Sequence, residues 1–308
     1  MSKFAKGLLG TTLLGLGLQV FVLVRGDERL DIGLASNGLA ICLSLLATAA
    51  TATAARVSNT YARRFWRLTA GSFFLMTAAQ VLGAYYDNIL HARLDSVWPS
   101  DLLYFLFVAP MAMTLFLRGK GRNAGVNWAQ ALDFLQIAIL MAAVYLYYFY
   151  MPSHWRGAGP AMVRLQWKFE VARDVFLLAA FAIRFTFVRS RLEWSLLSRL
   201  GAFLVVFTVG NIVYLYRQNT YGSDAGTLWD LCYSVPLVLA AVSACRWRLP
   251  EVPFAGGEPP RFGSAYPDHH RDRSPTRSGP PRRQSDRRSA PTPSRAAFRR
   301  VFVGPWST

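Results

Sequence analysis

Long apolar stretches, separated by short polar connections, occupy the chain as far as about residue 250. Each is roughly 17–25 residues long, the length an α-helix needs to span a hydrocarbon core of about 30 Å. The pattern predicts eight transmembrane helices, over 7–24, 33–55, 66–86, 101–117, 128–151, 171–188, 195–216 and 227–245. We therefore expect an all-α fold, a polytopic transmembrane helical bundle formed by residues 1–248.

After this point the composition changes abruptly to arginine, proline, serine and glycine, with no lysine. Such a segment cannot bury enough apolar surface to offset the entropy of its chain, so we predict a disordered, Arg/Pro-rich cytoplasmic tail over 249–308. A GC-rich coding region translated out of frame yields the same composition. We accordingly expect the chain to be the membrane part of a longer protein, truncated by a frameshift.

The net charge of +17 on 308 residues at first suggests a nucleic-acid partner. Within the apolar part, however, the basic residues lie in short connections between helices, which indicates a lipid bilayer and no nucleic acid. Alternate connections hold most of them, at Lys3, Lys6, Arg56, Arg63, Arg64, Arg118, Lys120, Arg122, Arg189, Arg191, Arg246 and Arg248. This bias places both termini in the cytoplasm. The third outer connection, with Arg156, Arg164 and Lys168, is an exception.

Two parts of the chain resemble each other, which predicts an internal four-plus-four repeat of helices. In each, a helix leads out from Arg-Leu, carries one amide side chain, and is followed by a helix that opens with Asp-Leu-x-Tyr. The matching residues are Arg67, Gln80, Tyr85, Asp101, Tyr104 and Pro110 in the first copy, and Arg199, Asn211, Tyr214, Asp230, Tyr233 and Pro236 in the second.

Charged residues inside predicted spans are costly in a bilayer and usually face the bundle interior. Asp133 lies in the fifth predicted helix, and Asp174 and Arg184 lie in the sixth. Asp174 and Arg184 are too far apart along the helix axis to pair. Arg184 has two readings, either extending its side chain to the membrane surface or pairing with Asp133.

Two carboxylates and several tyrosines gather at the predicted outer ends of helices. Asp101 and Asp230 open their helices, where a carboxylate favourably caps the N-terminus. The alternative is an outward-facing pocket for a small molecule, which combines aromatic walls with a few polar groups. Its candidate residues are Asp101, Tyr104, Asp230, Tyr233, Tyr85, Tyr86 and Tyr214, with Gln80 and Asn211 at its floor.

Sequence motifs typical of enzymes are missing. The chain has no GxxxxGK[ST], HExxH or GxSxG sequence, and no pair of histidines or cysteines at metal-ligand spacing. Its three cysteines, Cys42, Cys232 and Cys245, lie in apolar stretches. We predict no enzymatic activity, no cofactor and no metal site.

Several short segments resemble a family, the multi-helix N-terminal membrane regions of bacterial signalling proteins. The resemblance covers roughly residues 55–247. It is carried by Arg64-Phe65-Trp66-Arg67-Leu68, Trp98-Pro99-Ser100-Asp101-Leu102-Leu103-Tyr104, Leu132-Asp133 and Asp230-Leu231-Cys232-Tyr233. In that family such regions precede diguanylate cyclase, EAL phosphodiesterase or histidine kinase output domains. No GGDEF, EAL or kinase segment follows here.

The resemblance implies a sensory or signalling input module in the bacterial inner membrane, which binds an unknown ligand and acts through a homo-oligomer or a separate output protein. A small-solute transporter or permease is the alternative, since repeated helices with polar residues at depth are also found in transporters. A membrane-embedded enzyme is less favoured because no compact cluster of carboxylates or histidines faces the predicted cytoplasmic side.

Overall fold

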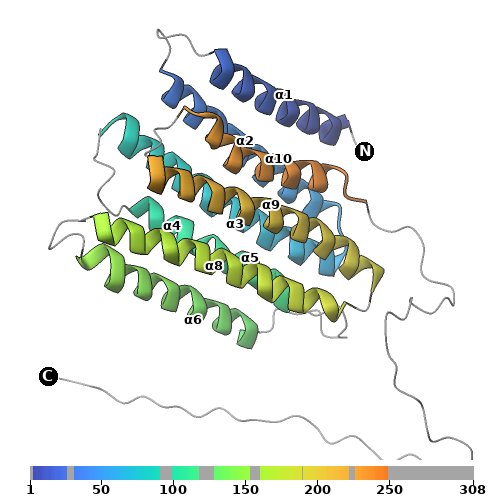
Figure 1. Cartoon of the computed structure of the whole chain (residues 1–308). Coiled ribbons are helices and arrows are strands. Elements are labelled where there is room, and N and C mark those ends of the chain that lie inside the picture. Colours follow the sequence, from blue (N-terminus) through green and yellow to red (C-terminus); the bar gives the residue numbers. More distant parts are fainter. Residues whose placement is uncertain are drawn as a thin grey trace, which may run out of the picture. The chain divides into compact units, whose positions relative to one another are not determined.

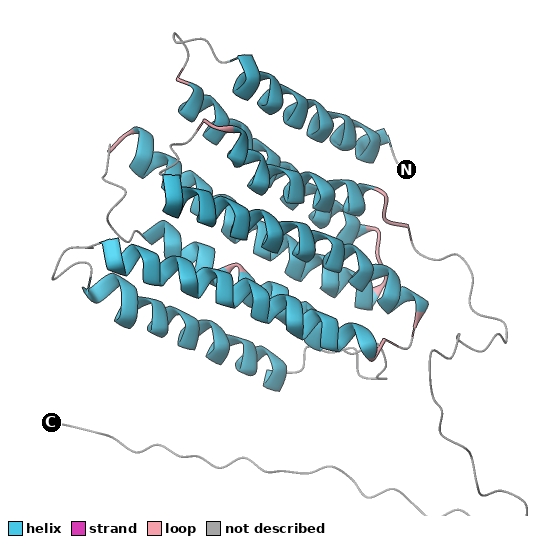
Figure 2. Ribbon diagram, viewed as in Figure 1, coloured by secondary structure: helices cyan, strands magenta, loops and turns pink. Residues whose placement is uncertain are grey.

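The computed structural model describes residues 3–25, 31–90, 99–117, 128–152, 160–188, 190–221 and 226–248, and the structural statements below concern these residues. They form helices and no strand (Figure 2). The helices are α1 (Lys3–Arg25), α2 (Ile32–Arg56), α3 (Thr60–Asn88), α4 (Pro99–Leu106), α5 (Val108–Phe116), α6 (Trp128–Tyr145), α8 (Pro160–Thr186), α9 (Arg191–Tyr221) and α10 (Leu231–Cys245), with a π-helical turn η1 (Leu146–Tyr150) and a 3₁₀ turn η2 (Leu228–Asp230). The tail predicted over 249–308 lies outside the described residues.

The all-α prediction is confirmed. The described residues form 8 helical segments in the predicted order. Three of these segments consist of two consecutive elements each, namely α4 and α5, α6 and η1, and η2 and α10. The sixth segment differs most from its prediction, since α8 begins at Pro160 and not near residue 171. Arg164 and Lys168, which were expected in an outer connection, therefore belong to this helix. Proline suits the first position of a helix, where its missing N–H costs nothing.

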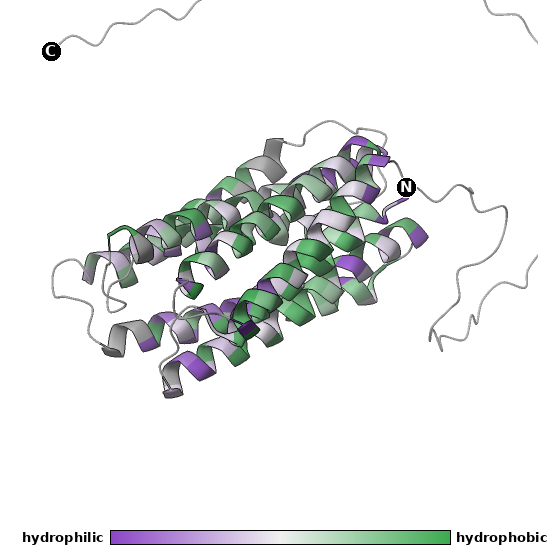
Figure 3. Ribbon diagram, turned by 90° about the horizontal axis from the view of Figure 1, so that it is seen from above, coloured by the Kyte–Doolittle hydropathy of each residue, from purple (hydrophilic) through white to green (hydrophobic). Residues whose placement is uncertain are grey.

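Six of the segments are long and apolar enough to cross a membrane, namely α1, α2, α3, α4–α5, α9 and η2–α10. Their middles are apolar and their polar residues gather mostly toward the ends (Figure 3). Large apolar side chains also face outward, and Leu14, Tyr147 and Phe176 are each more than 70% exposed. Soluble proteins rarely expose so much apolar surface. The chain is a multi-pass membrane protein.

The helices pack in a pattern that relates the first half of the chain to the second (Figure 1). In the first half α3 packs against α2 and α4–α5, and in the second half α9 packs against α8 and α10. The fourth segment of each half also contacts the other half: α10 packs against α1 and α2, while α4–α5 packs against α6 and α8. This reciprocal arrangement supports the predicted four-plus-four repeat.

Small and hydroxyl-bearing residues hold α2 close to its neighbours. Ala47, Ala50 and Ala54 are at most 2% exposed, so they let other helices approach its backbone. The Ser44 hydroxyl of α2 forms a 2.6 Å hydrogen bond with the Thr77 hydroxyl of α3. Hydrogen bonds between helices satisfy such groups where lipid cannot.

The fourth segment of each half contains a proline, which interrupts the first of these segments and lies inside the unbroken helix α10 in the second. Pro110 has no N–H to bond the carbonyl of Leu106, and α4 ends at that residue while α5 begins at Val108. Pro236 likewise cannot bond the carbonyl of Cys232 in α10. That carbonyl oxygen would lie 2.6 Å from a Cβ atom at Gly210, so the glycine permits a close approach of α9 to α10.

Candidate ligand-binding site

A buried polar network joins three helices at one end of the bundle. The side-chain amide of Asn211 in α9 donates to Asp174 Oδ2 in α8 at 2.7 Å, and its carbonyl oxygen accepts a hydrogen bond from the Tyr233 hydroxyl of α10 at 2.8 Å. Asp174 and Asn211 are 3% and 2% exposed. Burial at this depth requires that each polar group find a partner, and the network supplies them.

Arg173 extends this network to a fourth helix. Its Nε donates to Asp174 Oδ1 at 2.9 Å, and its second terminal nitrogen lies 2.8 Å from the same oxygen. Its first terminal nitrogen donates to the backbone carbonyl of Tyr104, one of the last carbonyls of α4, at 2.7 Å. The guanidinium also lies 5.4 and 5.3 Å from the ring centres of Phe105 and Phe107, within the range of cation–π attraction.

A cavity of about 250 Å³ lies beside the network, and we call it the α4/α8/α9 cavity. Aromatic side chains form much of its wall, at Tyr104, Phe107, Trp167, Phe207, Tyr214 and Tyr233. Leu215 and six charged or amide residues complete the lining, the latter being Asp101, Gln166, Glu170, Arg173, Asn211 and Gln218. The combination of aromatic walls with a few polar groups is typical of small-molecule sites, which are usually somewhat larger.

The fold brings these residues together because the ends of four helices meet there. Asp101 lies in the first turn of α4, Gln166 in the second turn of α8, Gln218 in the last turn of α9 and Tyr233 in the first turn of α10. The antiparallel order of the helices places all four ends on the same side of the bundle. That side is the outer one under the predicted orientation.

Five of the predicted ligand-binding residues line the cavity, namely Asp101, Tyr104, Asn211, Tyr214 and Tyr233. Three of them are in direct contact: Tyr214 packs edge-on against Tyr233 with ring centres 4.8 Å apart, and the Tyr233 hydroxyl donates to the Asn211 side-chain oxygen. The Tyr145 hydroxyl of α6 is hydrogen-bonded to Asp101. The structure thus gathers these five residues, and ligand binding by them stays a prediction.

Asp230, another of the predicted ligand-binding residues, does not line this cavity. Its Oδ2 accepts hydrogen bonds from the Ser36 hydroxyl of α2 at 2.6 Å and from the Gly226 backbone at 2.9 Å. Gln19 of α1 donates to the same Ser36 hydroxyl at 3.3 Å. Because α10 packs against α1 and α2, Asp230 fastens the start of its segment to the first half of the chain.

Gln80 and Tyr85 are also absent from the lining, so the predicted floor is formed by Asn211 without Gln80. The side-chain oxygen of Gln80 is buried and has no hydrogen-bond partner in the described part of the chain. Tyr85 is 45% exposed and packs edge-on against Tyr86, with ring centres 5.9 Å apart. Both belong to α3, which is not among the helices that line the cavity.

The sequence analysis missed the contribution of the first half of α8. Gln166, Glu170 and Arg173 recur at intervals of four and three residues, so they share one face of the helix. Val175 lies on the opposite side and is 47% exposed. The spacing of these polar residues was the signal in the sequence that could have revealed the cavity. It was not recognised because residues 152–170 were predicted to be a connection between helices.

Arg184, at the other end of α8, is held by α5 and α9. Its Nε donates to the Leu115 carbonyl at 2.9 Å, a terminal nitrogen donates to the Leu117 carbonyl at 3.4 Å, and it pairs with Glu193 at 3.7 Å. Arg184 therefore caps the last carbonyls of α5. The Asp133 side chain, its predicted partner, lies outside the described residues.

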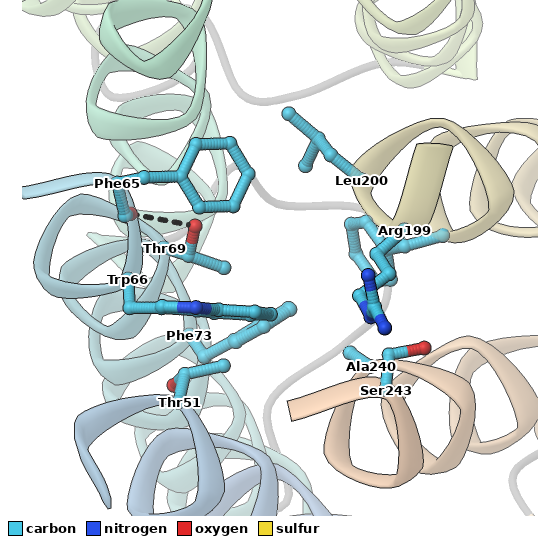
Figure 4. A pocket seen from close by; sticks show the side chains of 10 residues that line it. Thr51, Phe65, Trp66, Thr69, Phe73, Arg199, Leu200, Ala240 and Ser243 are labelled. Carbon is cyan, nitrogen blue, oxygen red and sulfur yellow. Dashed lines mark hydrogen bonds between the residues drawn. The ribbon is translucent and has the colours of Figure 1, made fainter. Parts of the chain in front are cut away.

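A second, much smaller cavity lies between α2, α3, α9 and α10 (Figure 4). Arg199 and Trp66 lie on opposite sides of it, with Phe65, Phe73 and Leu200 around them. Its volume is about 10 Å³, at the lower limit for one water molecule. The indole N–H of Trp66 has no hydrogen-bond partner among the described residues. Of the two cavities, the α4/α8/α9 cavity is therefore the one with room for an organic ligand.

Comparison with protein-family models, with curated proteins and with solved structures finds no match for the chain. The resemblance to membrane regions of bacterial signalling proteins thus rests on the short segments given above. Among the described residues no group of three or more histidine, cysteine or acidic side chains is placed to hold a metal ion. The cavity offers carboxylates, amides, phenols and aromatic rings, a set suited to binding a small molecule.

Proposed function

We propose that this protein is the sensory input module of a membrane signalling system, and that its ligand binds in the α4/α8/α9 cavity. The observation that carries the proposal is the direct contact between this cavity and the polar network of Arg173, Asp174, Asn211 and Tyr233. A ligand that enters the cavity touches the side chains that fasten four helices together.

The network gives a ligand a means of changing the packing of the helices. Arg173 holds α4 through the Tyr104 carbonyl and holds α9 and α10 through Asp174 and Asn211. A ligand favours whichever helix arrangement it binds more tightly, so competition for these hydrogen bonds would shift the equilibrium between two arrangements. The signal would then pass to a homo-oligomer partner or to a separate output protein.

The test is a ligand screen on the full chain in lipid nanodiscs, read as thermal stabilisation and as protection of backbone amides from hydrogen exchange. We expect a ligand that raises the melting temperature and changes exchange in α4, α5 and α8. Asp101→Asn should remove both effects, whereas Asp230→Asn, which alters the equivalent carboxylate of the other repeat, should keep them. Ligands that act equally on both variants would contradict the proposed site.

A small-solute transporter is the second candidate, and the interruption between α4 and α5 favours it. Transporter sites are often formed where a helix is broken near the middle of the bilayer. Phe107, which lies at the interruption, lines the cavity. Uptake of a radiolabelled cavity ligand into proteoliposomes separates the two functions. Uptake that Asp101→Asn abolishes would establish transport, and binding without uptake would support sensing.

A further inference from the structure

The charges at the α4/α8/α9 cavity define what kind of ligand it accepts. Asp101, Glu170 and Arg173 are the charged residues of its lining. Arg173 is neutralised by Asp174, and its Nε and both terminal nitrogens already contact Asp174 or the Tyr104 carbonyl. Two of its five N–H groups remain, but Asp174 already neutralises the positive charge that would attract an anionic ligand. The charges that remain at the cavity are those of Asp101 and Glu170. Burial raises the pKa of Glu170 to about 7, and a bound cation would favour its ionised form, so the site is suited to a positively charged ligand.

The aromatic lining fits a particular type of positive charge. Tyr104, Trp167, Tyr214 and Tyr233 present ring surfaces, which attract a cation over their faces and also pack against carbon atoms. An inorganic cation would instead need a shell of oxygen ligands, and aromatic rings supply few. An ammonium group with carbon substituents satisfies both the carboxylates and the rings.

The polar groups of the cavity agree with this assignment. Gln166 donates to Glu170 Oε1 at 3.4 Å, so one oxygen of that carboxylate is held in place while the other remains available as an acceptor. Asn211 and Tyr233 are engaged with each other and with Asp174. Gln218 and Trp167 add donors to the lining, so the charge and not hydrogen bonding selects the ligand: the carboxylate oxygens accept from a protonated amine and attract a quaternary ammonium group by its charge.

The volume limits the size of the ligand. A cavity of about 250 Å³ corresponds to roughly eight water molecules at about 30 Å³ each. This suits a compound of roughly eight non-hydrogen atoms. We infer that the α4/α8/α9 cavity binds a small organic cation, an amine or quaternary ammonium compound, between the carboxylates of Asp101 and Glu170 and the surrounding aromatic rings. The inference rests on the proposed ligand-binding function and names the ligand class for the same cavity.

The decisive experiment compares matched probes on the unmodified full-length protein in nanodiscs by isothermal titration calorimetry. Choline, tetramethylammonium and putrescine are the ammonium probes. The control is 3,3-dimethylbutan-1-ol, which has the shape of choline without its charge, and isovalerate provides an anion of similar size. We expect at least one ammonium probe to bind saturably, and at least about tenfold more tightly than the neutral and anionic compounds.

Variants then locate the binding. Glu170→Gln and Asp101→Asn keep the side-chain shape and should each weaken the ammonium probe by about tenfold or more, because each removes a partly desolvated opposite charge. Asp230→Asn should leave its affinity unchanged. Because the comparison of choline with its neutral isostere needs no variant, it remains decisive even if a substituted protein fails to fold.

The failures of the two proposals can be told apart. The organic-cation inference is overturned if no ammonium probe binds saturably, or if the neutral isostere binds as tightly as choline. The proposed ligand site fails separately, if every compound that stabilises the protein in the thermal screen keeps its effect in Asp101→Asn and Glu170→Gln. A neutral or anionic ligand that both variants weaken would overturn the ligand class and leave the site supported.

Discussion

Removing the charge of Asp174 should destabilise the protein strongly. Its carboxylate accepts three short contacts, two from Arg173 and one from Asn211, and the residue is 3% exposed. In Asp174→Asn the amide nitrogen must face one of these donors. Rotation of the Asn211 amide relieves that conflict, because the Tyr233 hydroxyl can accept as well as donate. The cost that remains is the loss of the counter-charge of Arg173, whose side chain is 8% exposed.

Breaking a buried ion pair by removing one partner typically costs about 3–5 kcal/mol. The amide rotation should place Asp174→Asn near the lower end, at about 3 kcal/mol. For a protein of this size such a loss lowers the melting temperature by roughly 6–12 °C. The assay is thermal unfolding in nanodiscs, followed through the reaction of buried Cys245 with a thiol-reactive dye.

A double-mutant cycle supplies the control. Arg173→Met with Asp174→Leu removes both charges, so it should cost less than the sum of the two single substitutions. A melting temperature of Asp174→Asn within about 2 °C of wild type, less than 1 kcal/mol of change, would refute the reasoning. Strict additivity in the cycle would refute it as well, because it would show that the two side chains do not stabilise each other.

Three further substitutions, one of them with a matched control, test other parts of the structure by thermal unfolding, amide exchange and ligand binding. Gly210→Ala places a Cβ 2.6 Å from the Cys232 carbonyl oxygen and should destabilise the protein by about 1–3 kcal/mol. The control Gly71→Ala meets nothing within 4 Å and should be neutral or stabilising. Equal effects of the two substitutions would contradict the close approach of α9 and α10. Pro110→Ala restores a helical N–H at the interruption between α4 and α5 and should slow the hydrogen exchange of the backbone amides there. An unchanged exchange rate would show that the proline does not cause the interruption. Asp230→Asn weakens the hydrogen bonds to Ser36 and Gly226 and should lower the stability of the protein by about 1 kcal/mol without affecting ligand affinity. Reduced affinity would mean that the Asp230 carboxylate belongs to the ligand site.

Most of the helices could be predicted from the sequence because lipid imposes a simple rule on them. A spanning segment must contain an apolar stretch of about 18 residues or more, and α1, α2 and α9 each contain one. The rule fails for α8, whose first half carries Gln166, Glu170 and Arg173 on the face toward the cavity. A helix that lines a polar cavity departs from the hydropathy pattern at the residues that face the cavity, so the start of α8 was placed too late.

Only part of the candidate site could be predicted, for a related reason. The repeated Asp-Leu-x-Tyr segments led to Asp101, Tyr104 and Tyr233, which do lie at the cavity. The repeat also predicted that Asp230 would have the same role as Asp101. Sequence similarity between repeats does not reveal what each copy packs against, and α10 packs against α1 and α2 while α4 packs against α6. The two carboxylates consequently have different partners.

The central claim is that the α4/α8/α9 cavity is an accessible site that favours organic cations. It can be tested without knowing the ligand, by placing single cysteines in a variant whose three native cysteines are replaced. Gln218→Cys lines the cavity, and Tyr221→Cys, on the same end of α9 and 63% exposed in the native protein, serves as the control. Each is modified in nanodiscs with methanethiosulfonates that carry either a trimethylammonium or a sulfonate group.

The measured quantity is the ratio of the two reaction rates at each position. We predict that the trimethylammonium reagent is favoured at Gln218→Cys by about tenfold or more relative to Tyr221→Cys, because the carboxylates of Asp101 and Glu170 concentrate cations in the cavity. Adding Glu170→Gln should reduce that preference. Equal ratios at the two positions, or faster reaction of the sulfonate reagent at Gln218→Cys, would contradict the account.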